Sequence, residues 1–156
     1  MKINALTVTT WIIPGLVAIG LSGSAFAKAS FDTEYQTAKQ KCDALTGNAK
    51  DICLVEAKGA LSVAQAEAEA SSKGTDAARL KADQARVEAD YQLAQQHCEA
   101  LSSHQKEVCR AEAKAAKVKG DAAAQLSSKK REATSELMNV KNKAHQGAGQ
   151  LGGAQP

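Results

Sequence analysis

The chain has 156 residues, a formal net charge of +3 and only 3% aromatic residues. A charge this small gives no electrostatic footprint for nucleic acid, so we expect no nucleic-acid partner. Residues 28–156 contain 28 alanines but only 17 Leu, Ile, Val and Phe residues together, which argues against a large apolar core. The strongest helix formers dominate, and prolines occur only at Pro14 and Pro156, so the composition predicts an all-α protein.

The N-terminal segment has the pattern of a secretory signal peptide. Lys2 precedes an apolar run at 11–21, which is followed by small residues and the sequence Ala25-Phe26-Ala27. Such an A-x-A sequence is a cleavage site, so we expect residues 1–27 to be removed. The apolar run is well short of the roughly 20 residues that span a bilayer, and we expect the mature chain not to span a membrane. The expected localisation is periplasmic, with full secretion as the alternative.

Two closely similar segments follow. The first, "YQTAKQKCDALTGNAKDICLVEAK", begins at Tyr35, and the second, "YQLAQQHCEALSSHQKEVCRAEAK", begins at Tyr91. Turn-forming residues divide this region into four expected helices, at 30–46, 49–72, 76–101 and 104–144. The predicted organisation is a helical hairpin, a second hairpin with an extended last helix, and a flexible Gly-rich tail, at 28–72, 73–144 and 145–156 respectively.

Within these helices, apolar residues recur at coiled-coil spacing. The stripe of the third helix consists of Leu80, Val87, Tyr91, Ala94, Cys98 and Leu101. Heptad stripes can be satisfied within one chain or between chains, and we expect a monomer. Two residues are expected to cap helices: Asn48, with Asp51 three residues later, and Ser102, with Gln105 three residues later.

Each repeat holds two cysteines at matching distances from its turn. Cys42 and Cys53 lie symmetrically about the first turn, and Cys98 and Cys109 about the second. On antiparallel helices each cysteine lies about 7.5 Å from its turn, so the two side chains of a pair should face each other. Because disulfides persist in exported proteins, we expect the bridges Cys42–Cys53 and Cys98–Cys109. The alternatives are bridges between the two repeats or between chains.

Two histidines near the second cysteine pair form a weaker metal hypothesis. Together with the cysteines of that repeat, His97 and His104 resemble a set of soft metal ligands. The equivalent positions of the first repeat are Lys41 and Asn48, so the repeat does not maintain this set. A disulfide would also remove both thiolates, and we therefore expect no metal and no cofactor.

The end of the last helix carries two features that suggest a partner. The basic cluster 129–131 could contact an anionic cell-surface polymer, although such a run is more often a solvated face. Further along, Leu137 and Val140 share one stripe with Ala133 and Ala144. We expect this stripe to pack on a neighbour.

The segment "YQTAKQKCDALTGNAKDICLVEAKGA" resembles the repeat of alanine- and lysine-rich exported proteobacterial proteins, often described as TolA-like envelope proteins. The resemblance covers the two repeats, about a third of the chain, and is carried mainly by the two cysteines and the "CDALTGNAKD" turn. In the second repeat "CEALSSHQKEVC" lacks both the Gly and the Asn of that turn. The resemblance implies an exported, helical protein and carries no assigned activity.

Three common catalytic motifs do not occur in the sequence, which has no G-x-S-x-G, no H-E-x-x-H and no P-loop. We therefore expect a non-enzymatic structural or interaction protein of the bacterial cell envelope, whose partner is another envelope protein or the anionic polymer. The alternatives are a periplasmic module that binds a metal or small ligand, and a holdase-type chaperone.

Overall fold

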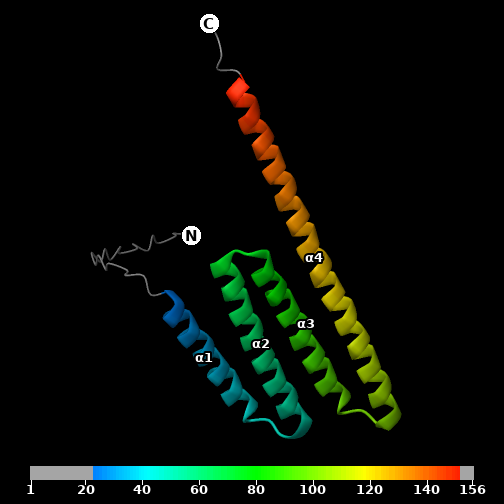
Figure 1. Ribbon diagram of the computed structural model, residues 1–156. Helices are drawn as coiled ribbons and strands as arrows, with labels where there is room; N and C mark the ends of the chain where they lie inside the picture. The colour runs from blue at the N-terminus through cyan, green and yellow to red at the C-terminus, as the bar shows by residue number, and fades with distance from the viewer. Residues whose placement is uncertain (1–22, 152–156) are drawn as a thin grey trace, which may run out of the picture.

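The computed structural model describes residues 23–151, and residues 1–22 and 152–156 lie outside this range. The described chain forms four helices and contains no strand: α1 (Gly23–Cys42), α2 (Gly47–Lys73), α3 (Asp76–Cys98) and α4 (Ser103–Leu151). Consecutive helices run antiparallel, and a disulfide links the two helices of each hairpin (Figure 1). The predicted all-α fold of two stapled hairpins is confirmed.

The helix bounds differ from the expected ones at both ends of the described chain. α1 begins at Gly23, so most of the expected signal peptide, residues 1–22, lies outside the described residues. α4 continues to Leu151, past the expected end at 144. Glycine in a helix costs only about 1 kcal/mol relative to alanine, so the glycines of this segment weaken the helix without ending it. The remainder of the expected flexible tail, 152–156, lies outside the described residues.

The four helices form one row. α2 packs against α1 and α3, and α3 packs against α4, while within residues 23–151 no contact joins α1 to α3 or α4. Figure 1 shows that α4 runs well past the turn between α2 and α3. The row is a single layer, so no second layer of described helices covers its broad faces.

Small residues make the contacts between the helices. The most buried apolar residues are two cysteines and six alanines, namely Cys42, Cys98, Ala57, Ala66, Ala78, Ala82, Ala113 and Ala124. A Cβ atom on Gly59 would lie 3.0 Å from the Cβ atom of Ala89, and one on Gly120 would lie 2.9 Å from both γ-methyl groups of Val87. The backbones of neighbouring helices therefore approach closely, and each seam buries little apolar surface.

The turns follow the sequence signals in part. Gly74 ends α2 at a φ of 64°, and Thr75 caps α3 by accepting a hydrogen bond from the backbone N–H of Ala78 at 3.2 Å. At the start of α4, the Ser102 carbonyl accepts the first helical hydrogen bond, from the backbone N–H of Lys106 at 2.7 Å, so Ser102 stands at the predicted cap position. Its hydroxyl donates to the Gln105 side chain at 2.9 Å.

The expected cap at Asn48 is wrong. Thr46 occupies the N-cap position of α2, and Gly47 adopts a φ of 58° at the first helical position. The side-chain oxygen of Asn48 instead accepts a hydrogen bond from the Gln96 amide of α3 at 3.0 Å. Asn48 therefore joins the two hairpins rather than capping its own helix.

Gly120→Leu should destabilise the protein by about 1–3 kcal/mol, because the new side chain would enter the space that the Val87 methyl groups occupy. Urea unfolding measures the effect. The control is Ala123→Leu, an exposed position on the same helix, which should change stability little. Recovery of the lost stability by adding Val87→Ala would confirm the contact, and equal effects of the two leucine variants would contradict it.

Candidate functional site

The two disulfides lie at the same end of the row, beside the α1–α2 and α3–α4 turns (Figure 1). The Cα atoms of Cys42 and Cys53 are 5.5 Å apart, and those of Cys98 and Cys109 are 5.6 Å apart. Both distances are ordinary for a disulfide. The structure thus joins each cysteine to the predicted partner within its own repeat, and Cys42 and Cys98 are fully buried.

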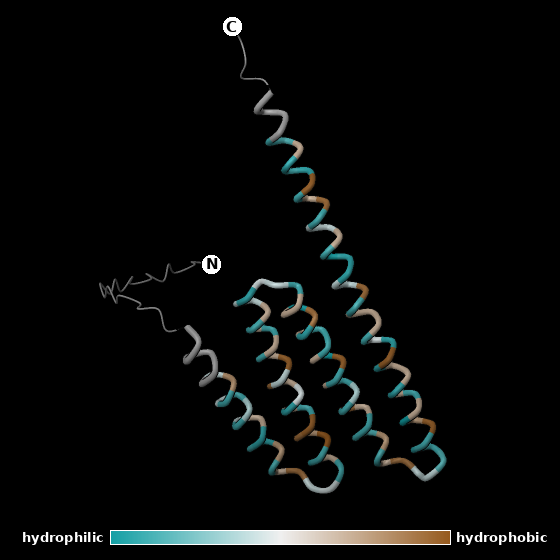
Figure 2. The backbone as a smooth tube through the Cα atoms, in the orientation of Figure 1, coloured by the Kyte–Doolittle hydropathy of each residue, from teal (hydrophilic) through white to brown (hydrophobic). Residues whose placement is uncertain are grey.

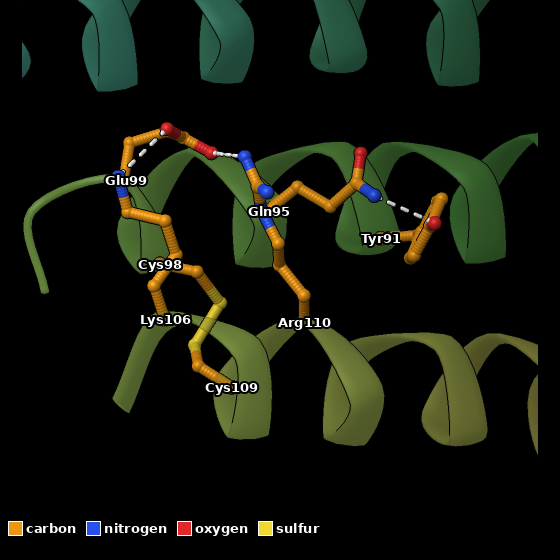
Figure 3. The surroundings of a disulfide bond; sticks show 7 residues. All are labelled: Tyr91, Gln95, Cys98, Glu99, Lys106, Cys109 and Arg110. Atoms are coloured by element: carbon orange, nitrogen blue, oxygen red, sulfur yellow. Dashed lines mark hydrogen bonds and ion pairs between the residues drawn. A yellow bond between two sulfur atoms is a disulfide. The ribbon is translucent and has the colours of Figure 1, made fainter. Parts of the chain in front are cut away.

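A pair of opposite charges accompanies each disulfide. Glu99 follows Cys98 and accepts hydrogen bonds from Arg110 and Lys106 of α4, the latter at 3.3 Å (Figure 3). These hydrogen bonds lower the pKa of Glu99, and the bond from Arg110 has the largest effect. In the first hairpin Asp43 follows the cysteine in the same way and lies 3.0 Å from Lys50.

Sequence reasoning missed these turn-spanning ion pairs. The signal was present in both repeats, as an acid directly after the first cysteine and a lysine seven residues beyond it. A hydrogen bond from Lys50 is the main reason that the pKa of Asp43 is also lowered. Each of these two turns is therefore bridged by a disulfide and by a carboxylate that forms ion pairs with the next helix, one pair at Asp43 and two at Glu99.

Further ion pairs join the α2 and α3 helices. Glu69 of α2 accepts hydrogen bonds from Lys73 and from Lys81 of α3, both at 2.6 Å. These two lysines lower the pKa of Glu69 to about 2. Two residues earlier on α2, Glu67 pairs with Arg86 of α3 at 2.7 Å.

The α3–α4 seam also carries ion pairs. Lys117 of α4 lies 3.3 Å from Glu88 of α3. The pKa of Lys117 is raised. The largest cause is its hydrogen bond to Asp121, and the next is its hydrogen bond to Glu88. Arg131 of α4 lies 3.4 Å from both Asp76 and Asp83 of α3, although its Nε atom has no hydrogen-bond partner. Ion pairs thus add to the stability of a helix contact that buries little apolar area.

Arg131 and two further arginines line an open hollow of about 430 Å³ whose lining comes from α2, α3 and α4. Arg79 bonds to Asp76 at 3.1 Å, and Arg86 bonds to Asp83 at 2.9 Å. Every arginine of this hollow is therefore already paired with a carboxylate. An anionic ligand would have to compete with these pairs, so the hollow is better explained as part of the inter-helix ion network.

The predicted basic cluster 129–131 does not act as one surface. Arg131 faces α3, whereas Lys129 points away from that seam and pairs with Glu132 at 2.9 Å. Lys130 is exposed. The structure therefore divides the cluster between the helix seam and the solvent, and contact with an anionic polymer stays a prediction.

His97 and His104 are both exposed, the first on α3 and the second on α4. Within residues 23–151 no three His, Cys, Asp or Glu side chains gather in a group that could hold a metal ion. All four cysteines are in disulfides. The structure therefore adds nothing to the metal hypothesis.

Neither a protein-family model nor a curated protein nor a solved structure matches this chain. The resemblance of the cysteine repeat to exported proteobacterial proteins accordingly stays a prediction. Across the part of the chain that the structure describes, no helix has the length and apolar character needed to cross a membrane.

Replacing one disulfide should loosen mainly the outer helix of its own hairpin. Cys42→Ser with Cys53→Ser should lower the free energy of unfolding by about 3 kcal/mol, because the unfolded chain gains freedom. Hydrogen exchange should show lost protection in α1, which among the described helices packs only on α2, and retained protection around Cys98–Cys109.

The matched control is Cys98→Ser with Cys109→Ser, which should loosen the start of α4 and spare α1. Equal loss of protection in both hairpins for either variant would show that the row unfolds as one unit. Peptide mapping of the oxidised protein provides a direct check, because a bridge from Cys42 to Cys98 or Cys109 would contradict the structure.

Glu69 should make the protein sensitive to acid. Because its pKa is lowered in the folded state to about 2, its contribution to stability is complete above the ordinary glutamate pKa and is lost as the pH falls through about 2. Glu69→Gln should therefore lower the melting temperature at pH 7 but have little effect near pH 2. Glu56→Gln, an exposed position on the same helix, is the control. An effect of Glu69→Gln that does not change with pH would contradict the ion-pair assignment.

Proposed function

We propose that this chain is an exported, non-enzymatic structural or interaction protein of a bacterial cell envelope. The observation that carries the proposal is the row of helices stapled by two disulfides.

The disulfides support an oxidising compartment. Because each seam buries mainly alanine and glycine, the hairpins depend on their cross-links more than a protein with a large apolar core does. A reducing cytosol would keep the four thiols free. The signal-peptide pattern at 1–27 provides the matching route of export.

The single layer supports an interaction role. A helix in the middle of the row, such as α2, uses two opposite sides for its neighbours and leaves two broad sides exposed. Lys58, Ser62 and Gln65 are exposed on one broad side of α2, and Glu56 and Ala60 are exposed on the other. Such surfaces are extended and rigid, and they suit contact with another macromolecule better than enclosure of a small substrate.

Export should be visible in cell fractions. The mature protein should occur in the periplasmic fraction with Lys28 as its first residue and with all four cysteines oxidised, as checked by N-terminal sequencing and thiol labelling. The control is a variant without residues 2–21, which should stay in the cytosol with reactive thiols. A wild-type chain found in the cytosol with intact N-terminus and free thiols would contradict the proposal.

A photo-crosslinking residue at Ser62 or Ala60 then tests the interaction role, because these positions lie on opposite broad sides of α2. We expect a discrete adduct with an envelope component from one side, and loss of that adduct when both disulfides are replaced by serine pairs. Turnover of a substrate by the oxidised mature protein would overturn the non-enzymatic assignment.

A further inference from the structure

Exposed apolar side chains concentrate on α4. The large ones are Val108, Val118, Leu126, Leu137, Met138 and Val140, and the last five are 59–72% exposed. Figure 2 shows hydrophobic positions along the coloured part of this helix, including the part beyond the other helices. A single exposed leucine needs no explanation, but a row of them on one helix indicates an interaction surface.

Most of these residues belong to a regular stripe. Ala111, Ala122, Ala133 and Ala144 are spaced eleven residues apart, and steps of four, three and four residues connect them. The α4 stripe consists of Ala111, Ala115, Val118, Ala122, Leu126, Lys129, Ala133, Leu137, Val140 and Ala144. All ten positions are exposed. An eleven-residue repeat has about 3.67 residues per turn, so the stripe runs nearly straight along the helix.

The α4 stripe lies on the side of the helix away from α3. The side that contacts α3 includes the buried residues Ala113, Ala124 and Ser128 and the closely packed Gly120. At about 100° per residue, this side and the stripe are opposite each other on the helix. Within residues 23–151, therefore, no helix of the same chain covers the stripe.

We infer that the α4 stripe pairs with the α4 stripe of a second copy of this chain, with the two helices antiparallel. The direction follows from the charges beside the stripe. Glu107 and Glu112 lie beside its start, and Lys141 and Lys143 lie beside its end. Between these ends both signs occur, at Lys114, Lys119 and Glu136. A parallel pair would place lysine beside lysine, whereas an antiparallel pair brings Glu112 of each copy to Lys141 of the other.

The side-chain sizes agree with an antiparallel register centred on Leu126. In this register Ala111 lies opposite Val140, Ala115 opposite Leu137, and Ala133 opposite Val118. A small residue thus faces a large one at each of these layers, which lets two helices pack without voids. Lys129 falls within the stripe, and its aliphatic stem can lie along the seam while its ammonium group reaches water.

The available area indicates a weak, closed dimer. The stripe is about 50 Å long and about 10 Å wide, which gives roughly 1,000 Å² over two copies. This is near the lower limit for a specific interface, so the dimer should form in the micromolar range rather than at nanomolar concentration.

The sequence alone favoured a monomer, and the exposure of this stripe is the reason to propose a dimer instead. The inference does not depend on export.

Sedimentation equilibrium of the oxidised mature protein tests the pairing. The wild type should pass from monomer to dimer with rising concentration, and Leu126→Lys with Leu137→Lys should weaken the dimer at least tenfold. The control is Ser127→Lys with Met138→Lys, which adds the same charge one position further along, off the stripe, and should change the dissociation constant less than twofold. Circular dichroism checks that all variants keep the wild-type helix content.

The direction of the pair has its own test. Glu112→Lys should weaken the dimer several-fold, and adding Lys141→Glu to the same chain should restore it, because each new lysine again meets a glutamate of the other copy. Failure of this restoration would overturn the antiparallel register.

Two other outcomes would overturn the pairing itself. One is a wild-type protein that remains monomeric up to about 0.5 mM, well above a micromolar dissociation constant. The other is a monomer that binds anionic phospholipid vesicles through Leu126 and Leu137, in which case the stripe contacts a lipid surface rather than a second copy.

Discussion

The close approach of neighbouring helices is the constraint on which the rest of the structure depends. A methyl group added at Gly59 would lie 3.0 Å from the Cβ atom of Ala89, and one added at Gly120 would lie 2.9 Å from the Val87 methyl groups, so both contacts are tight. Helices this close can bury only small side chains between them, so the seams contain alanine, glycine and cysteine. The apolar area gained is correspondingly small, and the disulfides and the ion pairs across each seam supply part of the stability that a larger core would otherwise provide.

The same constraint explains why the helices form a row rather than a bundle. α3 uses one side for α2, through Ala89 and Gln96, and the opposite side for α4, through Val87 and Cys98. Ion pairs border both contacts, which leaves polar residues toward the broad faces. In a bundle, the contacts of each helix share one apolar face directed at a common core, whereas the two contacts of α3 lie on opposite sides of the helix.

Sequence patterns predicted the features that depend on residues close together in the chain. The repeat, its turns and the cysteine pairs followed from spacing alone, because two cysteines at equal distance from a turn must meet on antiparallel helices. The heptad stripe predicted for α3 corresponds to the side that packs on α4, where Cys98 is buried and Val87 contacts Gly120. It did not include the side that packs on α2. The second side, with buried Ala78 and Ala82, was not recognised, because alanines are so frequent in this chain that they mark no particular face.

Other features could not be derived from local order. Asn48 was expected to cap its own helix, but its side chain bonds to Gln96, a residue 48 positions away. The outcome depends on how the two hairpins pack together, and a local capping rule does not include that contact. The division of the basic cluster 129–131 has the same origin, since only the position of α3 directs Arg131 to one side and Lys129 to the other.

The two ends of the row differ in a way that bears on assembly. At α1 the side toward α2 holds Phe31, Tyr35 and Ala38, and within residues 30–42 the outer side carries exposed polar residues, among them Gln36 and Gln40. At α4 the outer side is the apolar stripe. A row with an apolar surface at one end only can associate with a second copy through a two-fold symmetric contact, and the polar outer sides of α1 then lie at both ends of the assembly. Such a contact closes after two copies, whereas a row apolar at both ends could continue into a filament.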